Sequence, residues 1–188
     1  MIGVRMQIYR CLICGDTFVM QAKPENCPYC GSIDHYIVLT IDYPDDINDS
    51  ETTTQEYADL LHAAQLEYTN ATFYDELGKI DPASTLASLY RHLAKIEHEH
   101  LKVFAKLMKQ PADSLDFDRG IVLPKETWDA NISMSTAQEI DARDFYNLAA
   151  SRSITPRVIQ VFKAIAEVEQ SHIEVDALAR SIADTKTA

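Results

Sequence analysis

The stretch IEHEHLKVF at Ile96–Phe104 returns 72 residues later as VEQSHIEVD at Val168–Asp176. Both copies contain a Glu-x-x-His motif, and in both a further glutamate stands thirty residues before the motif. The two copies align without a gap, so the sequence indicates a duplicated unit. The shift aligns Glu67 with Glu139, Glu97 with Glu169, and His100 with His172.

Apolar residues around each motif recur at steps of three and four, which is typical of one face of an α-helix. On that face of the first copy, Glu97 and His100 are the polar members and lie one turn apart. The helical periodicity starts after Thr53 and dominates the rest of the chain. It predicts helices at residues 54–79, 83–109, 136–151 and 156–183.

Residues at the predicted helix ends support these bounds, because they can satisfy free backbone groups there. The expected capping residues are Thr53 with Glu56, Asp81 with Pro82, and Ser135 with Gln138.

The lengths of the connections predict how the helices are arranged. The first and second helices are joined by a few residues, as are the third and fourth, so each pair is expected to form an antiparallel hairpin. Between the hairpins lie about 25 residues, long enough to cross over the length of a bundle. The expected fold is mainly α, a ferritin-like four-helix bundle with a long crossover between helices two and three.

The repeated carboxylates and histidines predict a site for two metal ions. Buried, unpaired carboxylates are costly, and two divalent ions would neutralise four of them. Oxygen and imidazole ligands suit iron, with manganese as an alternative, better than structural zinc. The competing interpretation is exposed glutamates and hydrogen-bonded core histidines, but the motif occurs twice in register. The expected ligands are Glu67, Glu97, His100, Glu139, Glu169 and His172.

A second metal motif lies near the N-terminus. Cys11-x2-Cys14 and Cys27-x2-Cys30 are separated by twelve residues, and each pair is followed by a glycine. Four thiolates can bind one iron or a structural zinc ion, and the spacing leaves both open. We expect a small β module at residues 1–43, a linker at 44–53 and the bundle at 54–188.

Composition limits the classes of partner. The formal net charge of −12 argues against nucleic acid and anionic membrane surfaces. The sequence lacks an apolar run long enough to span a bilayer and a secretory signal pattern. All four cysteines lie in the first thirty residues, which favours metal binding in a reducing cytoplasm over disulfides.

These motifs together resemble the rubrerythrin family. Residues 9–15 with 27–31 look like the two cysteine turns of a rubredoxin-type iron centre. The six bundle ligands match the ferritin-like di-iron pattern, including a Phe-Tyr pair six and seven residues after the first glutamate of each copy. The resemblance covers nearly the whole chain, with the cysteine module before the bundle as in members of reversed domain order.

The resemblance implies a non-haem peroxidase that reduces hydrogen peroxide to water. Electrons from an NADH-linked reductase or a rubredoxin would pass through the cysteine-bound iron to the di-iron site. It also implies a homodimer or higher oligomer. One position departs from the family, since Ala142 stands where an extra glutamate is usual. This favours, as an alternative, a ferroxidase that handles iron and dioxygen; a third possibility is a bundle acting alone beside a structural zinc module.

Three further residues are singled out by the repeat. Tyr74 and Tyr146 lie two turns from the first glutamate of each copy, where we expect core aromatics, with a hydrogen bond to a ligand or a radical role as the alternative. Asp176 occupies the position of Phe104 and either orients a ligand or faces solvent.

Overall fold

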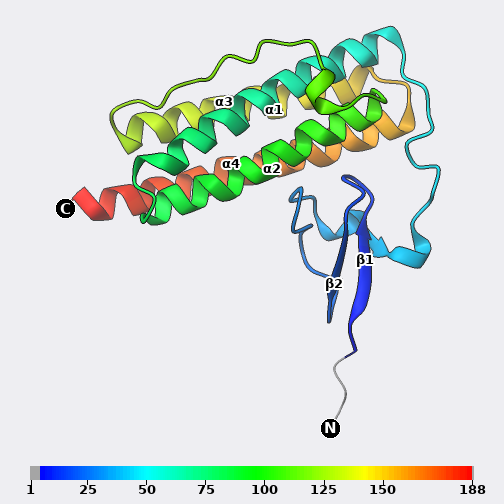
Figure 1. Cartoon of the computed structure of the whole chain (residues 1–188), viewed down its shortest axis with the longest axis horizontal. Helices are drawn as coiled ribbons and strands as arrows, with labels where there is room; N and C mark the ends of the chain where they lie inside the picture. Colours follow the sequence, from blue (N-terminus) through cyan, green and yellow to red (C-terminus); the bar gives the residue numbers. More distant parts are fainter. Residues whose placement is uncertain (1–4, 188) are drawn as a thin grey trace.

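Four long helices form the body of the molecule, and a small three-stranded sheet hangs from one side of it (Figure 1). The computed structural model describes residues 5–187, and the side chains of residues 5–184. The predicted fold class, a mainly α ferritin-like bundle preceded by a small β module, is confirmed. The helices are α1 Thr54–Ile80, α2 Thr85–Leu107, α3 Trp128–Arg152 and α4 Pro156–Thr187.

Helix α1 begins at the predicted capping box. The Thr53 N–H donates to Glu56 Oε2 at 2.8 Å, and the Glu56 N–H donates to Thr53 Oγ1 at 3.1 Å. The helix packs mainly against α2, while α3 packs mainly against α4. The two predicted antiparallel hairpins are therefore present (Figure 1).

The predicted start of α2 was wrong. Asp81 closes α1 as its C-cap, and its carbonyl accepts the Ser84 N–H at 2.8 Å in a turn. The turn delays the helix, so Ser84 is the N-cap and accepts the Ala87 N–H at 3.1 Å. Pro82, which was predicted to start the helix, lies in this turn.

The predicted start of α3 was also wrong, by eight residues. Its N-cap is Thr127, which accepts the Ala130 N–H at 3.2 Å. Ser135, expected with Gln138 to form a capping box, lies inside the helix and is fully buried. The Ser135 hydroxyl instead lies 2.9 Å from the Tyr74 hydroxyl. It therefore makes a side-chain hydrogen bond in the core and does not cap the helix.

The crossover between α2 and α3 is consequently shorter than predicted and covers residues 108–127. After the short helix η3 (Ala112–Ser114) it runs along the outside of the bundle to the far end (Figure 1). Gln65 Nε2 donates to the Asp118 carbonyl at 2.8 Å, and the Tyr68 hydroxyl donates to the Arg119 carbonyl at 3.2 Å. These bonds hold the crossover to α1.

The N-terminal module is an antiparallel sheet in the order β2-β1-β3. Strand β1 is Gln7–Cys11, β2 is Thr17–Met20 and β3 is Ile37–Leu39, with the short helices η1 (Asp34–Tyr36) and η2 (Thr40–Asp42) around β3. The sequence predicted a small β module here; β2 has only four residues, too few to show a strand period clearly.

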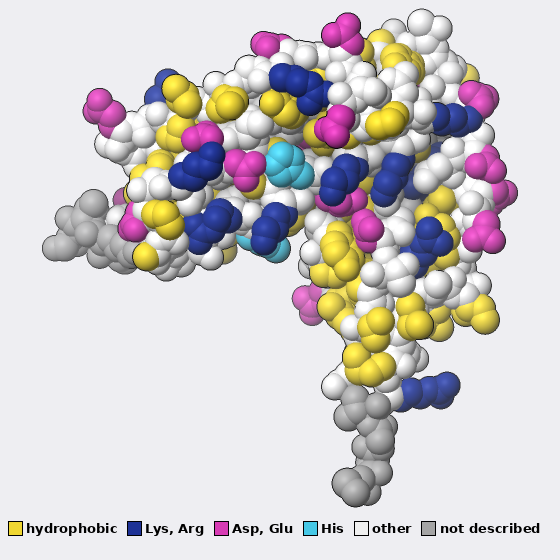
Figure 2. All heavy atoms as spheres, viewed as in Figure 1, with side chains coloured by type: hydrophobic (Ala, Val, Ile, Leu, Met, Phe, Trp, Pro, Cys, Tyr) yellow, Lys and Arg dark blue, Asp and Glu magenta, His cyan; other side chains and the backbone are white. Residues whose placement is uncertain are grey.

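Hydrophobic side chains gather on the outer surface of this module, below the bundle in Figure 2. They belong to a sheet too small to bury both of its faces. The exposed members are Met6, Ile8, Val19, Leu39 and Ile41.

The end of the module that carries the cysteines contacts the bundle of the same chain. The Lys106 ammonium donates to the Cys14 carbonyl at 2.5 Å, and Arg157 Nη2 donates to the Ile13 carbonyl at 3.1 Å. A Cβ on Gly31 would lie 2.9 Å from Val168 Cγ1, so only glycine permits this approach. Within residues 5–187, none of the helices has the length and apolarity that crossing a membrane requires.

Candidate metal centres

Each cysteine pair lies in a tight turn that a glycine closes. Gly15 (φ 83°) and Gly31 (φ 72°) adopt the left-handed backbone that glycine favours. Each donates its N–H to the carbonyl of the first cysteine of its turn, at 2.9 and 3.0 Å. The turns bring the four predicted ligand atoms within 4.8 Å of one another, all of them buried: Cys11, Cys14, Cys27 and Cys30.

The surroundings of these sulfurs fit a metal ion. All four are free cysteines. The Ile13 N–H points at Cys11 Sγ at 3.3 Å and the Asp16 N–H at Cys14 Sγ at 3.5 Å, so backbone dipoles favour negative charge on sulfur. Four such thiolates suit one iron or one zinc ion.

The six predicted bundle ligands also meet. One glutamate comes from α1, one from α3, and a Glu-x-x-His pair from each of α2 and α4. All six side chains are 0–3% exposed. They form two groups of four that share Glu97 and Glu169: a first half-site with Glu67 and His100, and a second half-site with Glu139 and His172.

Several polar atoms of this cluster have no hydrogen-bond partner among the described residues. Such atoms are rare in folded proteins, and a cluster of them indicates an ion. The donor set of four carboxylates and two imidazoles supplies hard oxygen and nitrogen ligands, which fit two ions of the iron or manganese kind. The unpartnered atoms are Glu67 Oε2, both Glu97 oxygens, His100 Nδ1, Glu139 Oε2, Glu169 Oε1 and His172 Nε2.

The pKa shifts of the buried carboxyls and imidazoles also favour a site for metal cations. Burial raises the pKa of the Glu67 and Glu139 carboxyls well above their usual range. Burial opposes a charged imidazole, yet the facing carboxylates raise the pKa of His100 and His172 well above the ordinary value. The cluster therefore favours positive charge at its centre, which metal cations supply.

The two histidines differ at their outer nitrogens. His100 Nδ1 lies 3.2–3.4 Å from three carboxylates, and its Nε2 donates to the Cys30 carbonyl at 2.9 Å. In the neutral ring this bond places the proton on Nε2, so Nδ1 is the nitrogen that can bind a metal. His172 Nδ1 lies 2.9 Å from Glu97 Oε1, but its Nε2 has no partner among the described residues.

Tyr74 and Tyr146 belong to the core, as expected, and each also hydrogen-bonds to a glutamate of the cluster. The Tyr146 hydroxyl donates to Glu67 Oε1 at 2.7 Å, and the Tyr74 hydroxyl donates to Glu139 Oε1. Each tyrosine therefore crosses from one hairpin to the first glutamate of the other. The interpretation as packing residues alone was incomplete.

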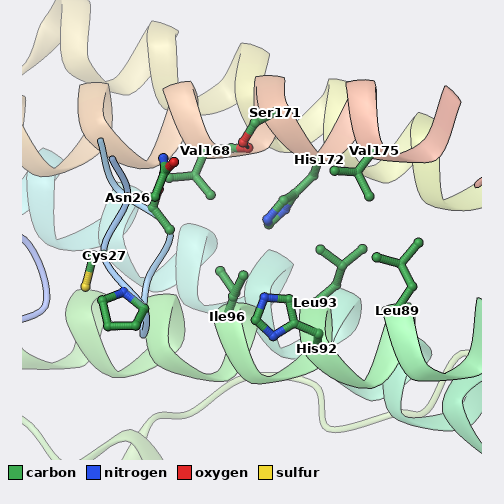
Figure 3. A pocket seen from close by; sticks show the side chains of 12 residues that line it. Asn26, Cys27, Leu89, His92, Leu93, Ile96, Val168, Ser171, His172 and Val175 are labelled. Atoms are coloured by element: carbon green, nitrogen blue, oxygen red, sulfur yellow. Dashed lines mark hydrogen bonds between the residues drawn. The ribbon is translucent and has the colours of Figure 1, made fainter. Parts of the chain in front are cut away.

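A cavity of about 400 Å³ leads from the surface to the second half-site. Figure 3 shows His172 pointing into it from α4, opposite His92 and Leu93 of α2, with Asn26 of the module at one side. At the first half-site the turn of Cys27–Cys30 lies over His100, whose Nε2 donates to the Cys30 carbonyl. The remaining wall of the cavity is formed mainly by aliphatic side chains, Leu89, Ile96, Val168 and Val175.

The sequence singled out Asp176 but not its buried polar partners near the second half-site. Asp176 is 1% exposed and accepts the Tyr90 hydroxyl at 2.9 Å and the Thr136 hydroxyl at 3.0 Å. It does not face solvent, so that expectation was wrong, and its hydrogen bonds run to Tyr90 and Thr136. The signal was available, since an aspartate on the apolar stripe of α4 needs buried partners.

Comparison with known families agrees with this architecture. The family model described as Rubrerythrin matches residues 59–179, a segment that contains all six bundle ligands. No curated protein and no solved structure matches the chain.

Proposed function

The chain belongs to the rubrerythrin family, and we propose that it is a di-iron peroxidase that reduces hydrogen peroxide to water. The family indicates a di-iron oxidoreductase; the peroxidase activity is our inference. The observation that carries it is the hydrogen bond from His100 Nε2 to the Cys30 carbonyl. This bond joins a four-thiolate site to a carboxylate site inside one chain, an arrangement suited to supplying electrons to the bundle.

Each half-site has the residues to hold one iron. Glu67 and His100 would bind the first ion and Glu139 and His172 the second, with Glu97 and Glu169 shared between them. Bound there, two irons supply the two electrons that cleave the O–O bond of peroxide. Four carboxylates balance the charge of two divalent ions, so the loaded core would be neutral.

The chain's own residues orient these ligands. Tyr146 and Tyr74 each occupy one oxygen of a terminal glutamate by hydrogen bonding, which leaves the other oxygen, Glu67 Oε2 or Glu139 Oε2, for the ion. The Cys30 carbonyl fixes the ring and tautomer of His100. Such contacts behind the ligands set metal affinity and reactivity.

The cavity at His172 suits entry of the oxidant. Its aliphatic lining admits a small uncharged molecule such as hydrogen peroxide or dioxygen, and disfavours ions. Two of its polar groups, His92 and the His172 ring, lie on opposite walls (Figure 3). We infer that peroxide approaches the second half-site through this cavity.

The cysteine module would deliver electrons singly. With iron bound by Cys11, Cys14, Cys27 and Cys30, it resembles a rubredoxin centre that accepts electrons from a reductase and ultimately from NADH. The path to the bundle is short: the Cys30 main chain, its carbonyl, and the His100 ring. Because the module lies on its own bundle, this path needs no second copy of the chain, and a homodimer remains a separate prediction.

Stopped-flow mixing of the fully reduced, iron-loaded chain with hydrogen peroxide tests the proposal. An oxidised iron–thiolate centre is red, so peroxide turnover in the bundle should restore the colour at a rate that matches peroxide consumption. The same chain loaded with zinc in the cysteine site is the control and should stay colourless. Return of the red colour much more slowly than peroxide loss would contradict the proposal.

Ala142 favours a ferroxidase as the second candidate. It is fully buried beside the ligands and offers no carboxylate at the place where the family usually has one. Fast oxidation of added Fe(II) by dioxygen together with slow peroxide turnover would select this activity. Metal analysis of the purified chain separates both from the third possibility, a structural zinc in the cysteine site.

A further inference from the structure

Repeat-related positions behind the two half-sites carry different side chains. Shifting by 72 residues turns Tyr90 into Phe162 and Phe104 into Asp176. Behind the first half-site, Tyr146 packs on both phenylalanines, with ring centroids 5.4 and 5.9 Å away. Near the second, the equivalent positions are a tyrosine and an aspartate, so here Tyr74 has an oxidisable neighbour, Tyr90, whose phenol has its own carboxylate acceptor.

Aromatic rings on this side form a continuous row. Tyr74 donates to the ligand Glu139, and its ring centroid lies 5.3 Å from that of Tyr90. Tyr90 in turn stacks on Trp128, with centroids 5.9 Å apart and an interplanar angle of 10°. Trp128 is the only tryptophan in the chain and is partly exposed at the start of α3. Three oxidisable rings, with successive centroids 5.3 and 5.9 Å apart, therefore join the second half-site to the surface.

Both tyrosines in the row have a proton acceptor, which oxidation of a buried phenol requires. The Tyr90 hydroxyl donates to Asp176 Oδ1 at 2.9 Å. The Tyr74 hydroxyl donates to Glu139 and also lies 2.9 Å from Ser135 Oγ. Burial raises the pKa of Asp176, which makes it a readier acceptor of a proton.

The row leads away from the cysteine module. Trp128 lines a surface hollow at the bundle end where α1 passes into α2, together with Asp81 and Ser84. Figure 1 shows this end of the bundle beyond the reach of the sheet, which hangs below the other half. An electron entering at Trp128 would thus use a route separate from Cys30 and His100.

We propose that Trp128, Tyr90 and Tyr74 form a second electron-entry route, through which a diffusible one-electron reductant such as a thiol or ascorbate reduces the second half-site. The proposal goes beyond the peroxidase function, because it needs neither the cysteine module nor a protein partner. It returns electrons to an oxidised centre when the module is not reduced, and so protects the buried ligands from oxidation.

Electrons and protons balance along the row. Tyr74 gives one electron to the oxidised centre while its phenolic proton moves along the hydrogen bond toward Glu139. Tyr90 replaces that electron and passes its own proton to Asp176, and Tyr74 regains its proton. Trp128 then reduces Tyr90, which takes its proton back from Asp176. The soluble reductant finally reduces Trp128, so one electron has moved from the reductant to the centre.

The route can be tested without iron and without activity. The full chain is loaded with zinc, which is redox-inert, and azidyl radicals from pulse radiolysis oxidise Trp128. Decay of the tryptophanyl absorption with growth of the tyrosyl absorption measures transfer to the neighbouring phenol. We expect a rate independent of protein concentration, which excludes transfer to exposed tyrosines of other molecules.

The variant Tyr90→Phe should slow this transfer by about tenfold or more, a barrier change of only about 1.4 kcal/mol. Asp176→Asn keeps both rings but weakens the proton acceptor, so it should slow the transfer as well. Phe162→Tyr adds a phenol at the repeat-related position and is the matched control, with the wild-type rate expected. Near-ultraviolet circular dichroism of each zinc-loaded variant checks that the core is intact.

Equal rates in the wild type and in Tyr90→Phe would overturn the proposal, as would a rate proportional to protein concentration. A second measurement uses the iron-loaded chain treated with peroxide and no reductant. Peptide mapping should find oxidised Trp128 in the wild type and about tenfold less in Tyr90→Phe. Failure of the peroxidase function would leave the zinc measurement unchanged, so the two hypotheses fail separately.

Discussion

The two half-sites have the same ligands and different neighbours. In each, one glutamate and one histidine are completed by the shared Glu97 and Glu169. The first half-site is covered by the Cys30 turn and backed by phenylalanines. The second faces a cavity and is backed by Tyr90 and Asp176. Duplication explains the shared ligands, whereas the divergence around them leaves the first half-site against the cysteine module and the second against a cavity.

The hydrophobic core also falls into two clusters, one near each half-site. One buried cluster joins the module to the half of the bundle that contains Phe104 and Phe162. A smaller cluster fills the other end around Tyr74 and Tyr90. The layer of buried carboxylates lies between them, so the two ends of the bundle can be changed independently and compared.

The largest expected effect comes from a carboxylate that both half-sites share. Glu97→Ala should abolish binding of both bundle ions, because each half-site loses a ligand and the charge balance fails. Glu139→Ala should empty mainly the second half-site. Elemental analysis of chains purified from iron-supplemented cells, with the cysteine site counted separately, measures the difference. Equal iron content in the two variants would show that the half-sites are not organised around a shared ligand.

The next effect concerns the cover over the first half-site. Gly31→Ala places a Cβ 2.9 Å from Val168 and should push the module off the bundle. Moving the Cys30 turn away from His100 would lengthen the hydrogen bond between them. We expect this to slow electron transfer from the cysteine site by about tenfold or more. Rapid-mixing measurements of the iron–thiolate colour follow that transfer.

Gly15→Ala is the matched control for this substitution. Gly15 has an equally left-handed backbone in the first cysteine turn, but its added Cβ would meet the Tyr43 hydroxyl at 3.3 Å and not the bundle. Both variants strain a cysteine turn, and only one disturbs the contact with the first half-site. Equal slowing in the two would mean that strain in the module, and not its docking, controls the rate.

A third prediction tests the bundle end beside the first half-site, where Glu56 joins α1 to the start of α4. Burial raises the pKa of Glu56, but its hydrogen bonds from Thr53, Ile154 and Thr155 outweigh burial and lower the pKa to about 2. A lowered pKa stabilises the fold above the ordinary value of 4.5, and this contribution is lost as the pH falls toward 2.

Glu56→Gln should therefore lower the free energy of unfolding by about 2 kcal/mol at neutral pH, and by less at pH values below the ordinary carboxyl pKa. Urea denaturation at several pH values gives the difference. Glu51→Gln, an exposed change nearby, should stay within about 0.5 kcal/mol of the wild type. A deficit for Glu56→Gln that is the same at every pH would contradict the assigned role of the ionised carboxylate.

The sequence predicted which carboxylates and histidines cluster, because their chemistry and their helical period are both local. The spacing from Glu97 to His100 places both on one helical face, and the repeat supplies the second pair. The starts of α2 and α3 were mispredicted for a local reason too: Asp81 and Ser135 are good capping residues in sequence, but both are used elsewhere.

The neighbours of the ligands were harder to predict because they depend on contacts between hairpins. The repeat revealed that Asp176 replaces Phe104, but its partner Tyr90 lies on another helix. The contact between Cys30 and His100 depends on how the cysteine module packs against the bundle. Helical or strand periodicity in the sequence carries no information about that packing. Sequence therefore determines the shared part of the two half-sites more readily than the part in which they differ.

The smallest expected effect separates the two ligand-bound tyrosines. Tyr146→Phe removes the donor to Glu67 Oε1, and the phenylalanine neighbours of Tyr146 offer no replacement, so it should cost about 2 kcal/mol of stability in the metal-loaded chain. Tyr74→Phe should cost about 1 kcal/mol less, because the Ser135 hydroxyl, 2.9 Å from the lost phenol, can turn toward Glu139. Thermal unfolding of both variants at fixed metal concentration measures the gap, and adding Ser135→Ala to Tyr74→Phe should close it. If the two single variants lose equal stability and Ser135→Ala adds nothing, the second half-site has no spare donor, and the polar surroundings that distinguish it do not protect its ligand.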